Sequence, residues 1–195
     1  MWLERVSGGG VDLIDLADAK THLRVLGDDF DAEIQQAISS ASAHLDVDED
    51  GFGGLGFPLV AQQWDLKLCR FGAALRLPFG RVTALHEIRY FQPDGIEQLA
   101  DAGTYRIVRE GRVFLVGCAP GSSWPTTQAR KDAVTVRFTS GWATAADVPQ
   151  DIKQCARLLV GHFFRNKEAT AGRDVPQQMQ LGIDALTRRY RGFAI

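Results

Sequence analysis

Hydrophobic side chains change their spacing twice along this chain. Residues 13–50 place apolar residues at helical intervals, residues 57–142 alternate apolar and polar residues, and helical intervals return from Pro149. Because a helix repeats every 3.6 residues and a strand every two, this order predicts helices, then strands, then helices. We therefore expect an α+β fold, with a helical core of about four helices and an antiparallel β unit inserted between the second and third helices.

The helical segments show start signals as well as apolar stripes. Asp15 is the expected N-cap of a short helix that ends near Gly27, and Asp28 or Asp29 is expected to cap the next helix. Pro149 suits the first turn of a third helix, and a fourth is expected over about residues 180–191. The apolar stripe of the second helix comprises Phe30, Ile34, Ala37, Ile38, Ala41 and Leu45.

The middle of the chain predicts about five to seven short strands. The expected strands lie around residues 64–68, 75–79, 82–91, 104–108, 113–116 and 133–138. Pro93-Asp94-Gly95 is a turn signal between two of them. In domain terms we expect a flexible arm over 1–12, because Gly8-Gly9-Gly10 cannot hold a helix, a helical core from 13–50 and 148–195, and the inserted β unit over 57–142.

Charge is distributed unevenly although the total is only −2. Residues 1–50 carry twelve acidic and three basic side chains, whereas residues 150–195 carry four acidic and eight basic ones. Two oppositely charged ends can attract each other within one chain, or between neighbouring copies in a head-to-tail ring. The sequence leaves both arrangements open, and the near-neutral total does not require a nucleic acid partner.

Several protein classes do not fit this sequence. No apolar run approaches the ~20 residues needed to span a bilayer, and the start Met1-Trp2-Leu3-Glu4-Arg5 lacks the features of a signal peptide, so we expect a soluble cytoplasmic protein without a membrane partner. Cys69, Cys118 and Cys155 are far apart and form no zinc-binding pattern. We expect no cofactor and no catalytic residue, because the sequence motifs of nucleotide-binding and hydrolytic sites are missing.

Two local patterns leave an alternative function open. Gly51, Gly53 and Gly56 match GxGxxG, but they follow a helix and precede a strand, which is the reverse of a dinucleotide site. Asp46, Asp48 and Asp50 match the first half of a calcium loop, yet Phe57 stands where the loop needs Glu. The alternatives are therefore a small hydrolase with a site in the β unit, or a cation-binding module that uses the Asp46-Asp48-Asp50 loop.

Several phrases, in this order, resemble the head–tail connector (adaptor, head-completion) proteins of tailed bacteriophages and of gene transfer agents. Each is weak alone, and their order and spacing carry the resemblance, which covers roughly residues 13–191. The phrases begin with Leu16-Ala17-Asp18-Ala19-Lys20-Thr21-His22-Leu23-Arg24-Val25, Asp28-Asp29-Phe30-Asp31 and Gln63-Trp64-Asp65-Leu66. They continue with Ile88-Arg89-Tyr90, Trp124-Pro125, Ala133-Val134-Thr135-Val136-Arg137-Phe138-Thr139-Ser140-Gly141-Trp142 and Val148-Pro149-Gln150-Asp151-Ile152-Lys153.

The resemblance implies a structural protein without catalysis, located in the neck of a phage-like particle and assembled in the bacterial cytoplasm. Such proteins form a ring of about twelve copies between the portal protein and a stopper or tail-terminator protein. DNA passes through the ring without specific binding. In relatives the C-terminal segment grips the portal, which here corresponds to Arg188, Arg189, Tyr190, Arg191, Phe193 and Ile195. For the contact between subunits, the charge asymmetry points to Asp28, Asp29, Asp31 and Glu33 on one copy, and to Lys153 and Arg157 on the next.

Overall fold

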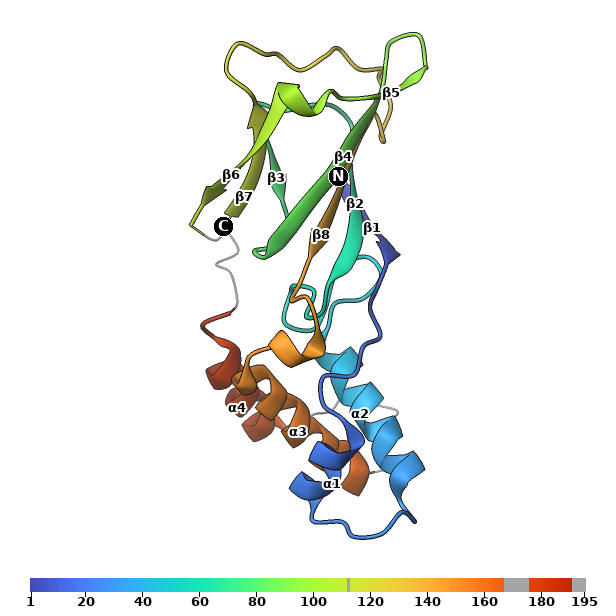
Figure 1. Ribbon diagram of the computed structural model, residues 1–195, viewed down its shortest axis with the longest axis vertical. Coiled ribbons are helices and arrows are strands. Elements are labelled where there is room, and N and C mark those ends of the chain that lie inside the picture. The colour runs from blue at the N-terminus through green and yellow to red at the C-terminus, as the bar shows by residue number, and fades with distance from the viewer. Residues whose placement is uncertain (112, 167–175, 191–195) are drawn as a thin grey trace. The chain divides into compact units, whose positions relative to one another are not determined.

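The computed structural model describes residues 1–111, 113–166 and 176–190 (Figure 1). Its helices are α1 (Leu16–Leu23), α2 (Asp31–Leu45), α3 (Gln150–Arg165) and α4 (Gln177–Thr187). Its strands are β1 (Trp2–Ser7), β2 (Gln62–Leu68), β3 (Ala74–Leu77), β4 (Val82–Phe91), β5 (Glu97–Leu99), β6 (Tyr105–Glu110), β7 (Val113–Cys118) and β8 (Val134–Ser140). The predicted α+β fold is confirmed, because β2 to β8 all lie between α2 and α3.

The chain divides into two compact units. The sheet unit comprises Met1–Gly8, Glu49–Phe52 and Ala61–Gly141, and the helical unit comprises Gly9–Asp48, Gly53–Val60 and Trp142–Ile195. None of the helices in the described part of the chain is long and apolar enough to cross a membrane.

Two antiparallel sheets build the sheet unit. One has the strand order β1-β2-β8-β4-β5 and the other has the order β3-β7-β6. Each sheet buries one face, as two-residue alternation requires. The larger sheet buries Trp64, Leu66, Ile88, Val136 and Phe138, and the smaller sheet buries Leu75, Leu77 and Val116.

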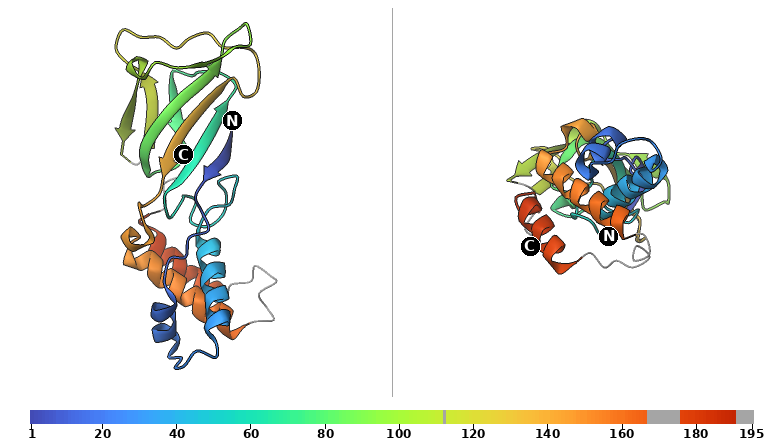
Figure 2. Two further views of the ribbon diagram at one scale, coloured as in Figure 1. Left: turned by 45° about the vertical axis from the view of Figure 1, so that its right-hand side comes forward. Right: turned by 90° about the horizontal axis from the view of Figure 1, so that it is seen from below.

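An aromatic chain links the buried faces of the two sheets. Tyr105 on β6 stacks on Trp124, Trp124 stacks on Phe71 with ring centroids 4.4 Å apart, and Phe71 meets Tyr90 on β4 edge to face. The two sheets therefore form a sandwich, and each sheet keeps an outer face (Figure 2). The aromatic contact lies between its two layers.

Strand β1 corrects the prediction of a flexible N-terminal arm. Residues 2–7 pair with β2, with Leu3 opposite Leu66 and Glu4 opposite Asp65. The glycine run begins only after this strand, and Gly8 has a φ of +84° where its backbone passes close to Ala61. The six residues of β1 do not alternate apolar with polar side chains, so period-two reasoning misses the strand.

The helical unit packs α2 against α3, with α1 and α4 also against α3. Its core holds Ile34, Ile38 and Leu45 from α2 and Ile152 and Leu159 from α3, all fully or almost fully buried. The residues of α2 belong to its predicted apolar stripe, and those of α3 follow the helical intervals predicted from Pro149. Phe30 is an exception, because it precedes the first turn of α2 and remains 44% exposed.

The ends of the helices agree only in part with the sequence prediction. The Asp15 side chain accepts a hydrogen bond from the Asp18 amide at 2.7 Å, which confirms the predicted cap of α1. Neither Asp28 nor Asp29 caps α2, because Phe30 is its N-cap residue and makes no side-chain cap bond. Helix α3 starts at Gln150, and Pro149 is its N-cap residue, one position before the predicted first turn. Helix α4 runs over Gln177–Thr187 rather than over 180–191, so Arg188, Arg189 and Tyr190 follow the helix.

Candidate functional site: docking surfaces

The C-terminal residues predicted to dock on a portal are partly fixed to helix α3. Arg189 and the Tyr190 hydroxyl both donate to the carboxylate of Asp151, in the first turn of α3. The Tyr190 ring packs edge to face on Trp142, with centroids 6.2 Å apart. Arg188 is exposed. The other three predicted residues, Arg191, Phe193 and Ile195, lie outside the described residues.

Inside α4, the last turn is also anchored. Thr187 is completely buried, and its hydroxyl donates to the Ile183 carbonyl at 2.7 Å. Leu181 on the same helix is 61% exposed and faces away from this anchor. The C-terminal segment is therefore anchored by Thr187, Arg189 and Tyr190, and it also presents exposed apolar and cationic side chains.

Two of the four predicted acidic interface residues bond to one lysine. Lys20 of α1 donates to Asp28 at 2.8 Å and to Asp31 at 2.7 Å, and these bonds order the loop between α1 and α2. The hydrogen bond from Lys20 lowers the pKa of Asp28, and the two carboxylates raise the pKa of Lys20. Asp29 and Glu33 are exposed on the same end of the helical unit.

The predicted basic interface residues make contacts within the chain. Arg157 of α3 holds Asp18 of α1 with two parallel bonds, Nε to Oδ1 at 3.0 Å and Nη2 to Oδ2 at 2.7 Å. This bidentate bond lowers the pKa of Asp18 and raises that of Arg157. Lys153 donates to the Ala146 carbonyl at 2.9 Å. At least one acidic residue from the start of the chain, Asp18, is therefore paired with a basic residue from its end, Arg157, within the same molecule.

The acidic loop after α2 has a structural role. Asp46 accepts hydrogen bonds from the amides of Val47 and Leu59, both at 3.0 Å, and so ties the end of α2 to residue 59. Among the described residues, no group of three or more His, Cys, Asp or Glu side chains is placed to hold a metal ion. Of the histidines, His44 is half-buried beside Phe163, and burial lowers its pKa.

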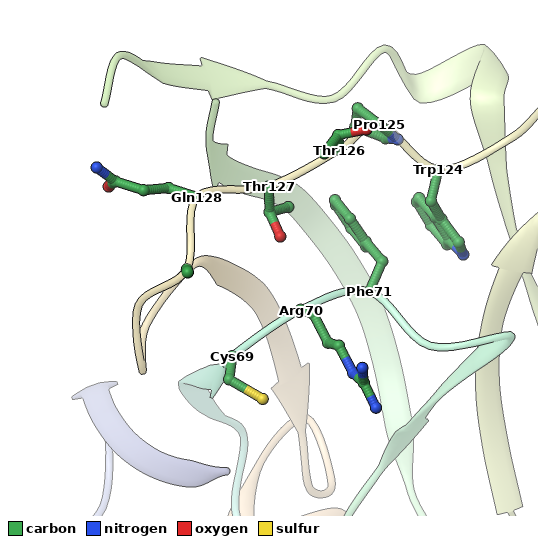
Figure 3. Close-up of a pocket in the computed structure, with 9 residues that line it drawn as sticks. Cys69, Arg70, Phe71, Trp124, Pro125, Thr126, Thr127 and Gln128 are labelled. Carbon is green, nitrogen blue, oxygen red and sulfur yellow. The ribbon is translucent and has the colours of Figure 1, made fainter. Parts of the chain in front are cut away.

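An open hollow of about 490 Å³ lies in the sheet unit, between the segments 69–71 and 124–129 (Figure 3). The stacked rings of Phe71 and Trp124 form one side of it. The residues that line it are Cys69, Arg70, Phe71, Trp124, Pro125, Thr126, Thr127, Gln128 and Ala129. This lining contains no carboxylate and no imidazole, so it offers stacking surfaces and hydroxyl groups rather than an acid–base pair.

A charged network lies on the outer face of the larger sheet, and the sequence alone does not predict it. Asp65 accepts two bonds of 2.7 Å from Arg137 and one of 3.4 Å from Arg89. The network reaches Glu87 on β4 and Glu97 on β5, and Lys67 on β2 pairs with Glu4 on β1. Asp65, Lys67, Glu87, Arg89 and Arg137 do follow the two-residue alternation, but only the strand order puts them side by side.

Comparison with known proteins shows which folds this chain resembles. No family model matches the chain, and no curated protein matches it at a significant level. Three solved structures that match the chain all come from gene transfer agent (GTA) particles. Two are chains in a particle neck: one from an empty particle computed with C6 symmetry, with a TM-score of 0.69, and one from a native particle computed with C12 symmetry, with a TM-score of 0.67. The third is a chain in the virion of a native GTA particle, with a TM-score of 0.68. Each is 22% identical in sequence, and each match covers 100% of this chain and 97% of the other. The whole fold of this protein, helical and sheet units together, is thus one that chains of gene transfer agent particles also have.

Proposed function

We propose that this protein is a structural component of the neck of a phage-like particle, and specifically the adaptor that joins the portal to the next neck protein. The observation that carries the proposal is the shared fold over 100% of this chain and 97% of chains from gene transfer agent particles. The order of the sequence phrases supports the same role independently of the structure. Both lines favour a non-enzymatic protein that works through its surfaces.

In this role the protein forms a rotationally symmetric ring around the DNA channel. The matched neck particles were computed with C6 and C12 symmetry, and a ring of about twelve copies suits both, because a twelvefold ring contains sixfold symmetry. The ring carries the DNA channel from the portal to a stopper or tail-terminator protein. Acidic side chains that face the channel repel DNA phosphates and keep the DNA from adhering.

The contact between subunits is proposed to use the acidic end of the helical unit. Asp28, Asp29, Asp31 and Glu33 form its acidic side, with Asp28 and Asp31 held in place by Lys20. Lys153 and Arg157 remain the proposed basic side. Because Arg157 already holds Asp18, this side contributes less charge to a neighbour than the sequence alone predicts.

The portal-binding segment is proposed to comprise Arg188, Arg189, Tyr190, Arg191, Phe193 and Ile195. The bonds of Arg189 and Tyr190 to Asp151 give this segment a fixed starting point, and Arg188 offers an exposed cation beside it. Apolar and cationic side chains in one short segment are typical of protein docking sites.

This proposal is tested by binding to purified portal protein. Replacing Arg188 and Arg191 with Glu reverses two charges without touching the bonds to Asp151, and we expect a folded protein whose affinity for the portal falls at least about tenfold. Arg70→Glu, a charge reversal in the sheet unit, is the matched control and should bind as the wild type does. Equal portal binding by both variants and the wild type would contradict the assigned segment.

A further inference from the structure

The two outer faces of the sandwich differ in charge. On the larger sheet, Glu4, Asp65, Glu87 and Glu97 outnumber Lys67, Arg89 and Arg137. On the two edge strands the carboxylates are the more exposed partners: the side chains of Glu4 and Glu97 are 49% and 44% exposed, whereas those of Lys67 and Arg89 are 23% and 30% exposed. Glu87, on β4, is 32% exposed. This face therefore presents carboxylates to its surroundings. Leu99, on the same face, is an apolar side chain that is 62% exposed.

The outer face of the smaller sheet carries Arg76, Arg106 and Glu110, so its net charge has the opposite sign. The strand register places Arg76 beside Leu115 and Val108, and Arg106 beside Gly117 and Ala74. Both arginines are exposed, and neither makes an ion pair with a carboxylate among the described residues. In contrast, Arg89, Arg130 and Arg137 of the same unit each pair with a carboxylate. Half-buried Leu115 and Val108 form an apolar strip between the two unpaired cations.

The spacing of charges on the two faces is similar. Arg76 and Arg106 are two strands and two residues apart, which separates their Cα atoms by about 12 Å. Glu4 and Glu87 are three strands apart in one row, and Glu87 and Glu97 are one strand and four residues apart, which gives about 14 Å in both cases. Arginine and glutamate side chains are long enough to accommodate this difference.

From this complementarity we propose that the sandwiches of neighbouring copies stack head to tail, with the outer face of β3-β7-β6 of one copy on the outer face of β1-β2-β8-β4-β5 of the next. Leu99 of one copy lies on Leu115 and Val108 of the neighbouring copy, and Arg76 and Arg106 of that neighbouring copy pair with Glu87 and Glu97 of the first. The inference rests on the proposed ring. It adds a second subunit contact, separate from the helical unit.

The geometry of a sandwich suits such a ring. A contact between two different faces of the same chain propagates from copy to copy, and it closes when the turn per copy divides a full circle. Twelve copies need a turn of about 30° per copy. A sheet of three short strands covers only about 250 Å² per partner, well below the ~800 Å² of a stable interface, so this contact alone is weak and depends on ring closure.

Cysteine cross-linking can capture such a weak contact. The full-length chain with Cys69→Ser and Cys118→Ser provides the background, into which Val108→Cys and Leu99→Cys are introduced separately. The two proteins are mixed at high concentration and oxidised, and we expect the mixed disulfide dimer to form at least about tenfold more than a dimer of Val108→Cys with Lys131→Cys. Equal yields for the two mixtures would overturn the proposal.

Charge reversal on the two faces is the second part of the cross-linking experiment. Adding Arg76→Glu and Arg106→Glu to the Val108→Cys chain should lower the mixed yield about tenfold, and adding Glu87→Arg and Glu97→Arg to the Leu99→Cys chain should then restore it. Failure of this rescue overturns the pairing of the two faces.

The same variants test whether the arginine face binds DNA instead. If the Arg76→Glu and Arg106→Glu changes abolish binding to a fluorescent DNA duplex and leave the cross-link intact, the arginine face serves DNA and the proposal is wrong. Portal binding of the same proteins is measured in parallel. If the cross-link fails to form but the protein binds the portal, only this sheet contact is refuted. If the cross-link forms but the protein does not bind the portal, only the adaptor role is refuted.

Discussion

Asp65 shows how one carboxylate holds three strands together. It is only 5% exposed, although it lies on the outer face of its sheet, because it is covered by Arg137 from the neighbouring strand β8 and by Arg89 from β4, the strand beyond β8. A nearly buried carboxylate with charged hydrogen-bond partners stabilises a fold chiefly by keeping those partners satisfied.

Asp65→Asn removes the charge and keeps the shape of the side chain. We expect the free energy of unfolding to fall by about 2 kcal/mol, measured by urea denaturation, because two guanidinium groups lose their shared anion. Asp132→Asn breaks the solvent-exposed pair with Arg130 and is the matched control, which should change stability little. An Asp65→Asn protein as stable as this control would contradict the structural role of the network.

Gly53 and Gly54 are neighbours with different reasons for being glycine. Both have positive φ, +81° for Gly53 and +49° for Gly54, but a Cβ on Gly53 would meet open space, whereas one on Gly54 would clash with the carbonyls of Leu45 and Asp46. We expect Gly53→Ala to cost about 1 kcal/mol of unfolding free energy and Gly54→Ala about 2–4 kcal/mol. Thermal or urea unfolding of the two variants checks this, and equal losses would refute the close approach at Gly54.

At the scale of elements, the bond between Asp18 and Arg157 fastens α1 to α3. The pKa of Asp18 is lowered in the folded protein, first by its hydrogen bond with Arg157. Stability from this group is thus present above the ordinary carboxyl range and is lost as the pH falls below about 4. The Asp18 side chain is 34% exposed, so water limits the contribution to about 0.5–1 kcal/mol.

Asp18→Asn should therefore destabilise the protein slightly at neutral pH and make its stability less dependent on pH in the acid range. Urea unfolding at pH 7 and at pH 3 measures both effects. Asp29→Asn, which breaks no ion pair among the described residues, is the control and should keep the wild-type acid dependence. A variant that loses as much stability in acid as the wild type would show that this pair does not fasten the helices.

Elements with a strong local pattern were predictable, and elements defined by their partners were not. The stripes of α2 and α3, the alternation of β2 and β8 and the Asp15 cap follow from local sequence, and the structure agrees with them. Strand β1 and the three-residue strand β5 have too little pattern of their own, because pairing with β2 and β4 makes them strands. The predicted cap of α2 was wrong: Phe30 is the N-cap residue, and Lys20 of the preceding helix holds the Asp28 carboxylate that could otherwise have capped α2.

The candidate docking surfaces were predictable in composition and less so in arrangement. Counting charges showed an acidic start and a basic end, but it could not show that Arg157 and Arg189 are held by Asp18 and Asp151 in the same molecule. The opposite charge of the two sheet faces was also beyond the sequence, since it depends on which strands neighbour one another. Both cases need the three-dimensional order of elements that are far apart along the chain.

For the whole molecule, the fold, the uneven charge and the order of the sequence phrases all agree with the proposed role. Two compact units supply separate surfaces, a helical unit with an anchored C-terminal segment and a sandwich with oppositely charged faces. A ring protein needs surfaces of this kind, because each copy must present one face to its neighbour and receive another.

The most direct test of this role is cryo-electron microscopy of the neck of particles assembled with this protein, at a resolution that shows side chains. We expect this chain, traced by its own sequence, in a rotationally symmetric ring directly below the portal, with its C-terminal segment against the portal and the DNA channel passing through the centre. Complete necks whose density below the portal belongs to another chain would contradict the proposed function.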